Sequence, residues 1–165
     1  AGLSGVLSAE RMVTEYVERL YAPAALAYRA VTADGHQPAR DLAVWKARVA
    51  AAWPGVVVLH VESGGGDAVP TVGETLGVRA RIALAGLAPD DVEVEVVHGH
   101  AGDGDRIRDP ERQALELESV ADGVALYRGT VVLDAPGSFG YTVRVTPSHP
   151  LLTAPAELPL VALAS

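Results

Sequence analysis

Apolar residues in the first third of the chain recur at the spacing of a helix. Within residues 8–21 the apolar side chains form one stripe along the helix, and the charged side chains lie largely outside it. The stripe consists of Val13, Tyr16, Val17, Leu20 and Tyr21. Ser8 can cap the first exposed amide groups, and Glu10 stands in the first turn, where the helix dipole favours a carboxylate. The pattern predicts an amphipathic helix over residues 8–21.

Two more helical pieces are expected before Pro54. Pro23 interrupts the pattern or starts a fresh turn, after which residues 24–30 continue as a helix up to the turn residues Asp34 and Gly35. A further helix begins at Pro38, a residue suited to a first helical position, and places an apolar face on residues 42, 45 and 49. The chain is therefore predicted to begin with two or three α-helices.

After Pro54 the pattern changes to that of β-strands. In the clearest case, Val92, Val94 and Val96 alternate with acidic residues, so that one face of the strand is dry and the other wet. Strands are predicted at residues 56–62, 76–84, 92–98, 112–118, 124–133, 139–145 and 157–163. Seven short antiparallel strands after N-terminal helices predict a mainly β fold, an immunoglobulin-like β-sandwich without its inter-sheet disulfide. The expected domains are a helical segment, 1–53, and a β-sandwich module, 54–165.

Composition and charge narrow the possible partners. The formal charge of −8, from 21 acidic and 13 basic side chains, repels a nucleic-acid backbone and an anionic membrane surface. Cysteine is absent, which excludes disulfides, thiolate zinc sites and cysteine nucleophiles and fits a reducing compartment. The sequence shows neither a signal peptide nor about 18 uninterrupted apolar residues, so a cytoplasmic location is expected. Neutral ligands and other proteins are the more plausible partners.

The segment HGHAGDGD comes closest to a metal-binding pattern. His98 and His100 lie two apart on a predicted strand, and Asp103 and Asp105 follow in the next loop. A strand that ends in a solvated turn explains the segment equally well. The acidic residues up to Asp109 lack the glycine and the distal glutamate of a helix-loop-helix calcium site. No metal ligand is assigned.

Aromatic residues are the candidates for carbohydrate contact, because sugars present apolar C–H faces to aromatic rings. The candidates are Trp45, Trp53, Tyr127 and Tyr141. Trp45 falls on the apolar stripe of its helix and Tyr141 alternates with other strand residues, so both are expected in the core.

Catalytic groups are not evident. Ser148 and His149 stand in a proline-bounded segment that is typical of a loop, and no G-x-S-x-G elbow is present. Asp90 and Asp91 follow a proline and precede a strand, a pattern that predicts a solvated turn rather than a general acid–base pair. No catalytic residue is assigned.

Three segments carry a resemblance to a known family. They are LSAERMVTEYVERLYAPAA (7–25), LAPDDVEVEVVHG (87–99) and SFGYTVRVTPSHPLL (138–152), the last followed by AELPLVAL. The first is similar to the helix that closes the catalytic body of glycogen and starch phosphorylases. The family's helix has a serine cap, an arginine, a hydrophobic residue and two aromatic residues. In this sequence the corresponding residues are Ser8, Arg11, Val13, Tyr16 and Tyr21. Together the segments resemble the C-terminal region of a long bacterial α-glucan phosphorylase.

The resemblance implies a parent enzyme that releases glucose 1-phosphate from α-1,4-glucan with pyridoxal phosphate bound to a lysine. The only lysine here, Lys46, lies in a predicted helix without a glycine-rich phosphate cradle, so no cofactor-binding residue is assigned. The expected function is a non-catalytic accessory domain whose partner is the catalytic body, with α-glucan and a second copy of the chain as further candidate partners. The alternatives are an independent carbohydrate-binding module and a helix-mediated protein-interaction or dimerisation module.

Overall fold

The chain divides into two compact units. The computed structural model describes residues 11, 14, 17–64, 73–102, 104, 106–133 and 137–164. One unit is Ala1–Lys46, here called the helical unit, and the other is Ala47–Ser165, here called the β unit. Within the described ranges, no helix combines the length and the apolar content that a membrane span requires.

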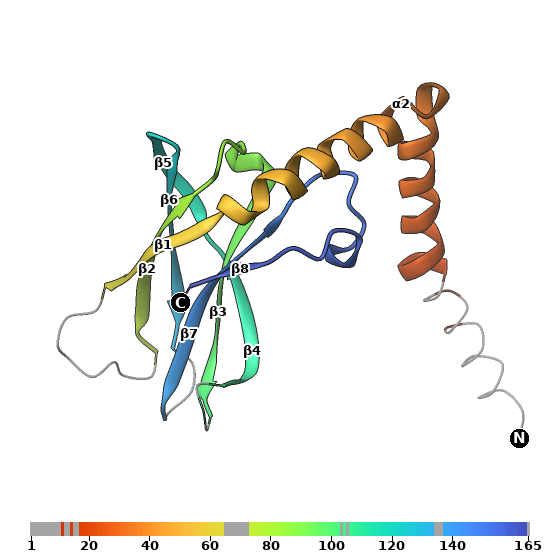
Figure 1. Cartoon of the computed structure of the whole chain (residues 1–165). Coiled ribbons are helices and arrows are strands. Elements are labelled where there is room, and N and C mark those ends of the chain that lie inside the picture. Colours follow the sequence, from red (N-terminus) through yellow and green to blue (C-terminus); the bar gives the residue numbers. More distant parts are fainter. Residues whose placement is uncertain are drawn as a thin grey trace, which may run out of the picture. The chain divides into compact units, whose positions relative to one another are not determined.

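Helical structure continues from a short π-helix, Val17–Tyr21, into helix α2, Ala22–Ala52 (Figure 1). Helix α2 loses helical geometry once, at Ala33 to His36, where Asp34, Gly35 and His36 have φ angles of 46°, 64° and 69°. The predicted turn at Asp34 and Gly35 is therefore confirmed. The helix resumes with Pro38 in its first new turn, where the missing amide proton costs no hydrogen bond. Half of the predicted helix at residues 8–21 lies outside the described residues.

In place of the two or three separate helices that were predicted, the structure has one interrupted helix. Its two stretches are joined only by the left-handed residues around Gly35, so residues 24–30 and the segment after Pro38 do adopt the predicted helical structure. The second stretch ends in a 3₁₀ turn, η2, Trp53–Gly55, which leads directly into the first strand.

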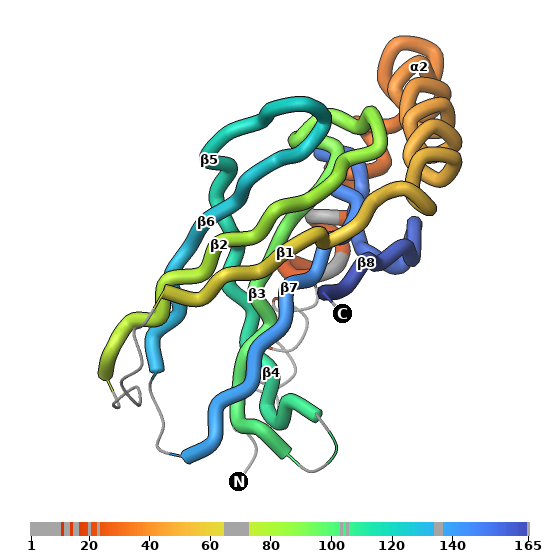
Figure 2. Tube along the Cα trace, turned by 60° about the vertical axis from the view of Figure 1, so that its left-hand side comes forward, coloured from red at the N-terminus to blue at the C-terminus, as the bar shows by residue number. Residues whose placement is uncertain are grey.

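The β unit contains two antiparallel sheets of four strands each (Figure 2). The strand order is β1-β2-β6-β5 in one sheet and β4-β3-β7-β8 in the other. The bounds are β1 Val57–Gly64, β2 Thr75–Ala83, β3 Val92–Ala101, β4 Ile107–Ala114, β5 Glu116–Ala121, β6 Val124–Val132, β7 Phe139–Pro147 and β8 Ala162–Leu163, with 3₁₀ turns η3 Pro89–Asp91 and η4 Pro155–Glu157. The described residues thus hold eight strands, and the predicted seven was wrong.

The additional strand arises because the predicted strand at residues 112–118 is two strands. The chain leaves the sheet of β3 and β4 at Leu115 and enters the sheet of β5 and β6 at Glu116. Leu115 is 7% exposed, and its amide donates a hydrogen bond to the carbonyl of Val94 at 2.8 Å. Burial of this one leucine between the two strands fixes the crossover from sheet to sheet.

The last strand is shorter than expected. The prediction of a strand over residues 157–163 is correct only for β8, Ala162–Leu163. Glu157 instead closes η4, and its Oε1 accepts a hydrogen bond from the amide of Thr153 at 2.9 Å. Pro159, which has no amide proton, separates this turn from β8.

Alternation along the strands builds the core, as the pattern predicted. In β3, Val92, Val94 and Val96 are 6%, 2% and 0% exposed, whereas Glu93 between them is exposed. The inward positions of β2, β6 and β7 are buried in the same way; they include Val78, Ala80, Ile82, Ala125, Val131, Val143 and Val145. The exposed strand positions carry polar side chains such as Glu93 and also apolar ones such as Val120 and Val132.

Candidate functional site

A groove of about 570 Å³ crosses one end of the sheet β1-β2-β6-β5. Its walls come from residues 62–64 of β1, 77–79 of β2 and 128–130 of β6, together with Gln113, Ala114 and Glu116 at the crossover from β4 to β5. All of these residues belong to the β unit. The crossover that sequence reasoning missed therefore forms one side of the groove.

A row of four charged side chains lines this groove. Glu62 of β1 is paired with Arg79 of β2, Arg79 with Arg128 of β6, and Arg128 with Glu116 of β5. Directly paired residues of antiparallel strands point to the same face, and this face is opposite to that of the buried Val78. The row carries two positive and two negative charges, so its net charge is zero.

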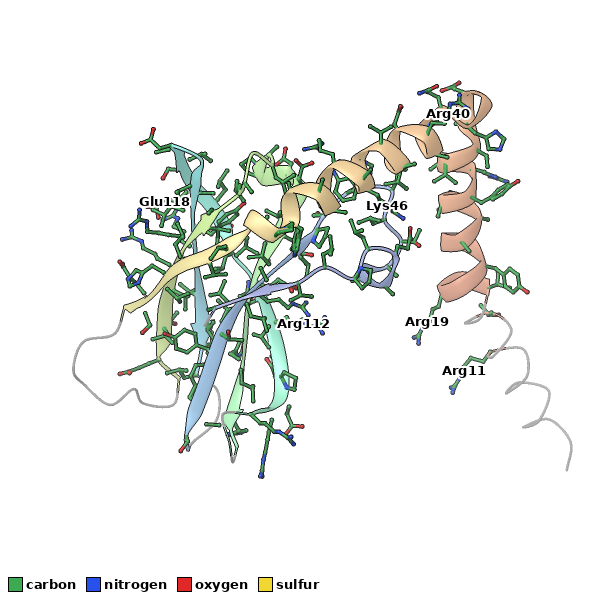
Figure 3. The ribbon with its side chains drawn as sticks, in the orientation of Figure 1. Arg11, Arg19, Arg40, Lys46, Arg112 and Glu118 are labelled. Carbon is green, nitrogen blue, oxygen red and sulfur yellow. The ribbon has the colours of Figure 1, made fainter. Side chains whose placement is uncertain are left out.

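The side chains of the row can both donate and accept hydrogen bonds. Guanidinium groups are donors only and carboxylates are acceptors only, so adjacent arginines and glutamates offer both functions side by side. Arg79 also makes an exposed ion pair with Glu118, with Nη2 and Oε1 3.4 Å apart; Glu118 is labelled on β5 in Figure 3.

Glycines form part of the floor of the groove. Gly64 and Gly77 are paired directly across β1 and β2, and they line the groove together with Gly129 of β6. A Cβ added to Gly64 or Gly77 meets no described atom closer than 3.9 or 3.8 Å, whereas one added to Gly129 would lie 2.6 Å from Cδ2 of Leu115. Within the described residues, a side chain at position 129 would thus force Leu115 to shift, whereas positions 64 and 77 have room for one.

Asp91 is not in a solvated turn, and that part of the prediction was wrong. Its side chain is 10% exposed and forms a bidentate ion pair with Arg48 of α2. Arg48 Nη1 donates to Oδ2 at 2.9 Å and Nη2 to Oδ1 at 2.7 Å, while the amide of Ala88 donates to Oδ2 at 2.8 Å. The hydrogen bonds to Asp91 raise the pKa of Arg48. Asp90, next to it, is exposed as predicted.

A second partly buried ion pair joins β3 and β7. Glu95 and Arg144 are directly paired in register, and Arg144 Nε donates to Glu95 Oε2 at 3.1 Å. Their side chains are 13% and 21% exposed. Glu95 and Arg144 are 49 residues apart in the sequence, so the alternating pattern alone could not reveal this contact. Both ion pairs hold structural elements together and leave no free reactive group.

The structure places His98 and His100 of the candidate metal site in one small pocket, together with Asp109 and Glu111. His98 is 8% exposed and its ring lies 5.8 Å from that of Phe139, whereas His100 is exposed. Asp103 and Asp105 lie outside the described residues, and Asp109 has a φ of 48°. Among the residues that the structure describes, no three His, Cys, Asp or Glu side chains are grouped in a way that could hold a metal ion.

Three of the four candidate sugar-binding aromatics are buried. Trp45, Trp53 and Tyr127 are 8%, 8% and 4% exposed, which confirms the core position expected for Trp45. Tyr141 is half-buried and stacks on Phe139 with ring centroids 6.3 Å apart. The hydroxyl of Tyr127 donates to the carbonyl of Pro89 at 3.5 Å; burial raises the pKa of Tyr127, and the charge of Asp90 raises it further. The three buried rings therefore offer no open platform for a sugar.

Ser148 and His149 lie in the loop after β7, as predicted. The amide of Ser148 donates to the carbonyl of Asp91 at 2.9 Å, and His149 Nδ1 accepts a hydrogen bond from the amide of Leu151 at 3.1 Å. These contacts order the loop. Like the groove and the two ion pairs, the loop belongs to the β unit.

Residues 53–165 match the model of the glycogen phosphorylase C-terminal domain. The chain belongs to this family. It is 41% identical to a glycogen phosphorylase of Mycobacterium tuberculosis (strain ATCC 25618 / H37Rv) over 157 residues, which are 94% of the chain and 18% of that protein. It is 31% identical to a maltodextrin phosphorylase of Thermococcus litoralis over 149 residues, 86% of the chain and 16% of that protein. The chain thus spans less than a fifth of the relatives that it matches, and the resemblance to this region of a phosphorylase is confirmed.

In this member of the glycogen phosphorylase C-terminal domain family, the residues present do not fit pyridoxal phosphate. The cofactor needs a lysine for its Schiff base and donors for its phosphate. Lys46 is the only lysine in the sequence and lies in the interior of α2, where the backbone amides are engaged in helical hydrogen bonds and cannot cradle a phosphate. Figure 3 shows its position on the helix. No step of phosphorolysis is derived from this chain.

Proposed function

We propose that the chain is a non-catalytic C-terminal accessory domain of an α-glucan phosphorylase, the class of enzyme that releases glucose 1-phosphate from α-1,4-glucan. The observation that carries the proposal is the family match over residues 53–165, together with 41% identity over 94% of the chain but only 18% of the relative. The parent enzyme would contain pyridoxal phosphate in its catalytic body, outside this chain.

The proposed partner of the helical unit is that catalytic body. Large apolar side chains of this unit are exposed: Val17 by 47%, Tyr21 by 62%, Leu26 by 65% and Tyr28 by 68%. A cluster of exposed apolar side chains on one short segment favours contact with another protein surface. A second copy of the chain could cover the same residues, and sedimentation at several concentrations separates the two cases.

We further propose that the β unit is an immunoglobulin-like sandwich. In the standard lettering such a fold has the strand orders A-B-E-D and C-F-G. The order β1-β2-β6-β5 matches the first sheet, and β3-β7-β8 matches the second, with β4 as an extra edge strand beside β3. We also propose that the chain divides into two domains, residues 1–53 and 54–165. A cytoplasmic location is a further proposal.

A phosphorolysis assay tests the non-catalytic assignment. The purified chain is mixed with pyridoxal phosphate, inorganic phosphate and glycogen, and glucose 1-phosphate is measured with a coupled enzyme. The mycobacterial glycogen phosphorylase, tested in parallel, provides the positive control. The chain should release no glucose 1-phosphate above the blank. Turnover above the blank would show that it carries a catalytic site and would overturn the proposal.

A further inference from the structure

We propose that the groove across β1, β2 and β6 binds a segment of an α-1,4-glucan chain. The choice of an α-glucan rests on the proposed function, whereas the site itself rests on the shape, the charge and the glycines of the groove. Its residues are those of the charged row, Glu62, Arg79, Arg128 and Glu116, above the paired glycines Gly64 and Gly77.

The two paired glycines point to a ligand because no described side chain fills the space over them. Gly77 lies inside β2, whereas Gly64 is the last residue of β1. Glycine in the interior of a strand lowers stability relative to alanine by roughly 0.5–1 kcal/mol, and it commonly marks a place where a ligand approaches the backbone. Neither Gly64 nor Gly77 is among the glycines with positive φ, and neither is crowded by a described atom. By contrast, a Cβ at Gly129 would lie 2.6 Å from Cδ2 of Leu115, so that Leu115 would have to shift. Among the described residues, the space over Gly64 and Gly77 is thus open to a ligand.

The charges of the groove favour a neutral ligand rich in hydroxyl groups. Two arginines and two glutamates cancel within the row, so the four side chains together favour neither an anion nor a cation. Each sugar hydroxyl is both a donor and an acceptor, and neighbouring hydroxyls can bridge an arginine and a glutamate in the same row. The strongest of these contacts are charge-assisted hydrogen bonds.

The dimensions of the groove fit an oligosaccharide. Its volume of about 570 Å³ lies within the range of roughly 300–1,000 Å³ that is typical of small-ligand sites. It is lined by residues from five strands, β1, β2, β4, β5 and β6, and so forms an extended surface. A glucan segment with the polar edge of its sugars on the charged row needs no aromatic platform.

Titration calorimetry of the full chain with maltoheptaose tests the site. Wild-type chain should give saturable heat. Gly77→Val fills the floor of the groove with a residue that strands prefer, so it should keep or raise the melting temperature while it abolishes binding. Arg128→Ala should weaken binding by about tenfold or more, because it removes a charged donor. Arg112→Ala is the matched control: it removes an exposed arginine from β4, outside the groove, and should leave binding unchanged.

Several results would overturn the inference. They are the absence of saturable binding by the wild type, binding that survives Gly77→Val in a folded protein, and equal losses in Arg112→Ala and Arg128→Ala. Equal binding of the β-linked cellohexaose, or tighter, salt-sensitive binding of glucose 1-phosphate, would also contradict a neutral α-glucan as the ligand. None of these results changes the outcome of the phosphorolysis assay. The glucan site can therefore be disproved while the accessory role is retained.

Discussion

The ion pair between Arg48 and Asp91 should be the most important polar contact that holds the end of α2 in the β unit. Asp91→Ala removes three hydrogen bonds to a carboxylate whose side chain is 10% exposed, two from Arg48 and one from the amide of Ala88. The amide of Ala88 would then lack this acceptor. Arg48 is 49% exposed, so its guanidinium can regain water when the partner is lost.

The expected loss of stability lies between that of a surface pair and that of a buried one. Exposed ion pairs contribute about 0–1 kcal/mol, and removal of one partner from a fully buried pair costs about 3–5 kcal/mol. With one partner buried and the other half exposed, we expect Asp91→Ala to lower the free energy of unfolding by about 2–3 kcal/mol. For a chain of this size, that loss lowers the melting temperature by about 4–12 °C.

Urea unfolding followed by tryptophan fluorescence measures the effect, since Trp53 is buried next to the end of the helix. In a double-mutant cycle, Arg48→Ala and Asp91→Ala should couple by about 1–2 kcal/mol. Glu118→Ala is the control: its ion pair with Arg79 is exposed and 3.4 Å long, so we expect a change below about 0.5 kcal/mol. A loss below about 0.5 kcal/mol for Asp91→Ala, or additive single variants, would refute the reasoning.

Two further predictions concern buried aromatic side chains. Burial raises the pKa of Tyr127 above its ordinary value of 10.0, so above pH 10 the folded state keeps a proton that the unfolded chain releases. The contribution of protonated Tyr127 to the stability of the fold is fully present below pH 10. It is lost as the pH rises through the raised pKa. Tyr127→Phe should therefore weaken the loss of stability above pH 10 in urea titrations, and an unchanged slope would contradict it. Trp53 buries an indole N–H that has no hydrogen-bond partner among the described residues, so Trp53→Phe should cost less than about 1.5 kcal/mol, whereas Trp53→Ala should cost about 3–5 kcal/mol. Similar melting temperatures for these two variants would contradict this reading.

The sequence pattern predicts the strands wherever one face is uniformly apolar. β3 and β2 follow their valine and alanine alternation closely, and the turn at Asp34 and Gly35 follows from residues that accept a positive φ. The crossover at Leu115 could not be predicted this way. Residues 112–118 alternate like a single strand, and only the burial of Leu115 against both sheets divides them.

The candidate groove could not be predicted from the sequence, because it depends on strand register. Arg79 and Arg128 become neighbours only when β2 pairs with β6, and Gly64 faces Gly77 only in the observed register of β1 and β2. Similarly, Asp91 meets Arg48 across 43 residues, so the local turn pattern around Pro89 correctly predicted a turn but not its burial. Local patterns indicate elements, whereas sites of this kind arise from pairings between distant elements.

A competition experiment tests the central claim, that this domain packs against the body of a phosphorylase, most directly. The mycobacterial glycogen phosphorylase is shortened by the segment that matches this chain, and its own removed segment is added back with a fluorescent label to report complex formation. We expect this chain to compete for the same body and to lose that ability when Leu26 and Tyr28, both exposed on α2, are changed to glutamate, while Arg29→Glu leaves competition intact. If the labelled segment binds and this folded chain does not compete at any concentration, the accessory-domain account is contradicted.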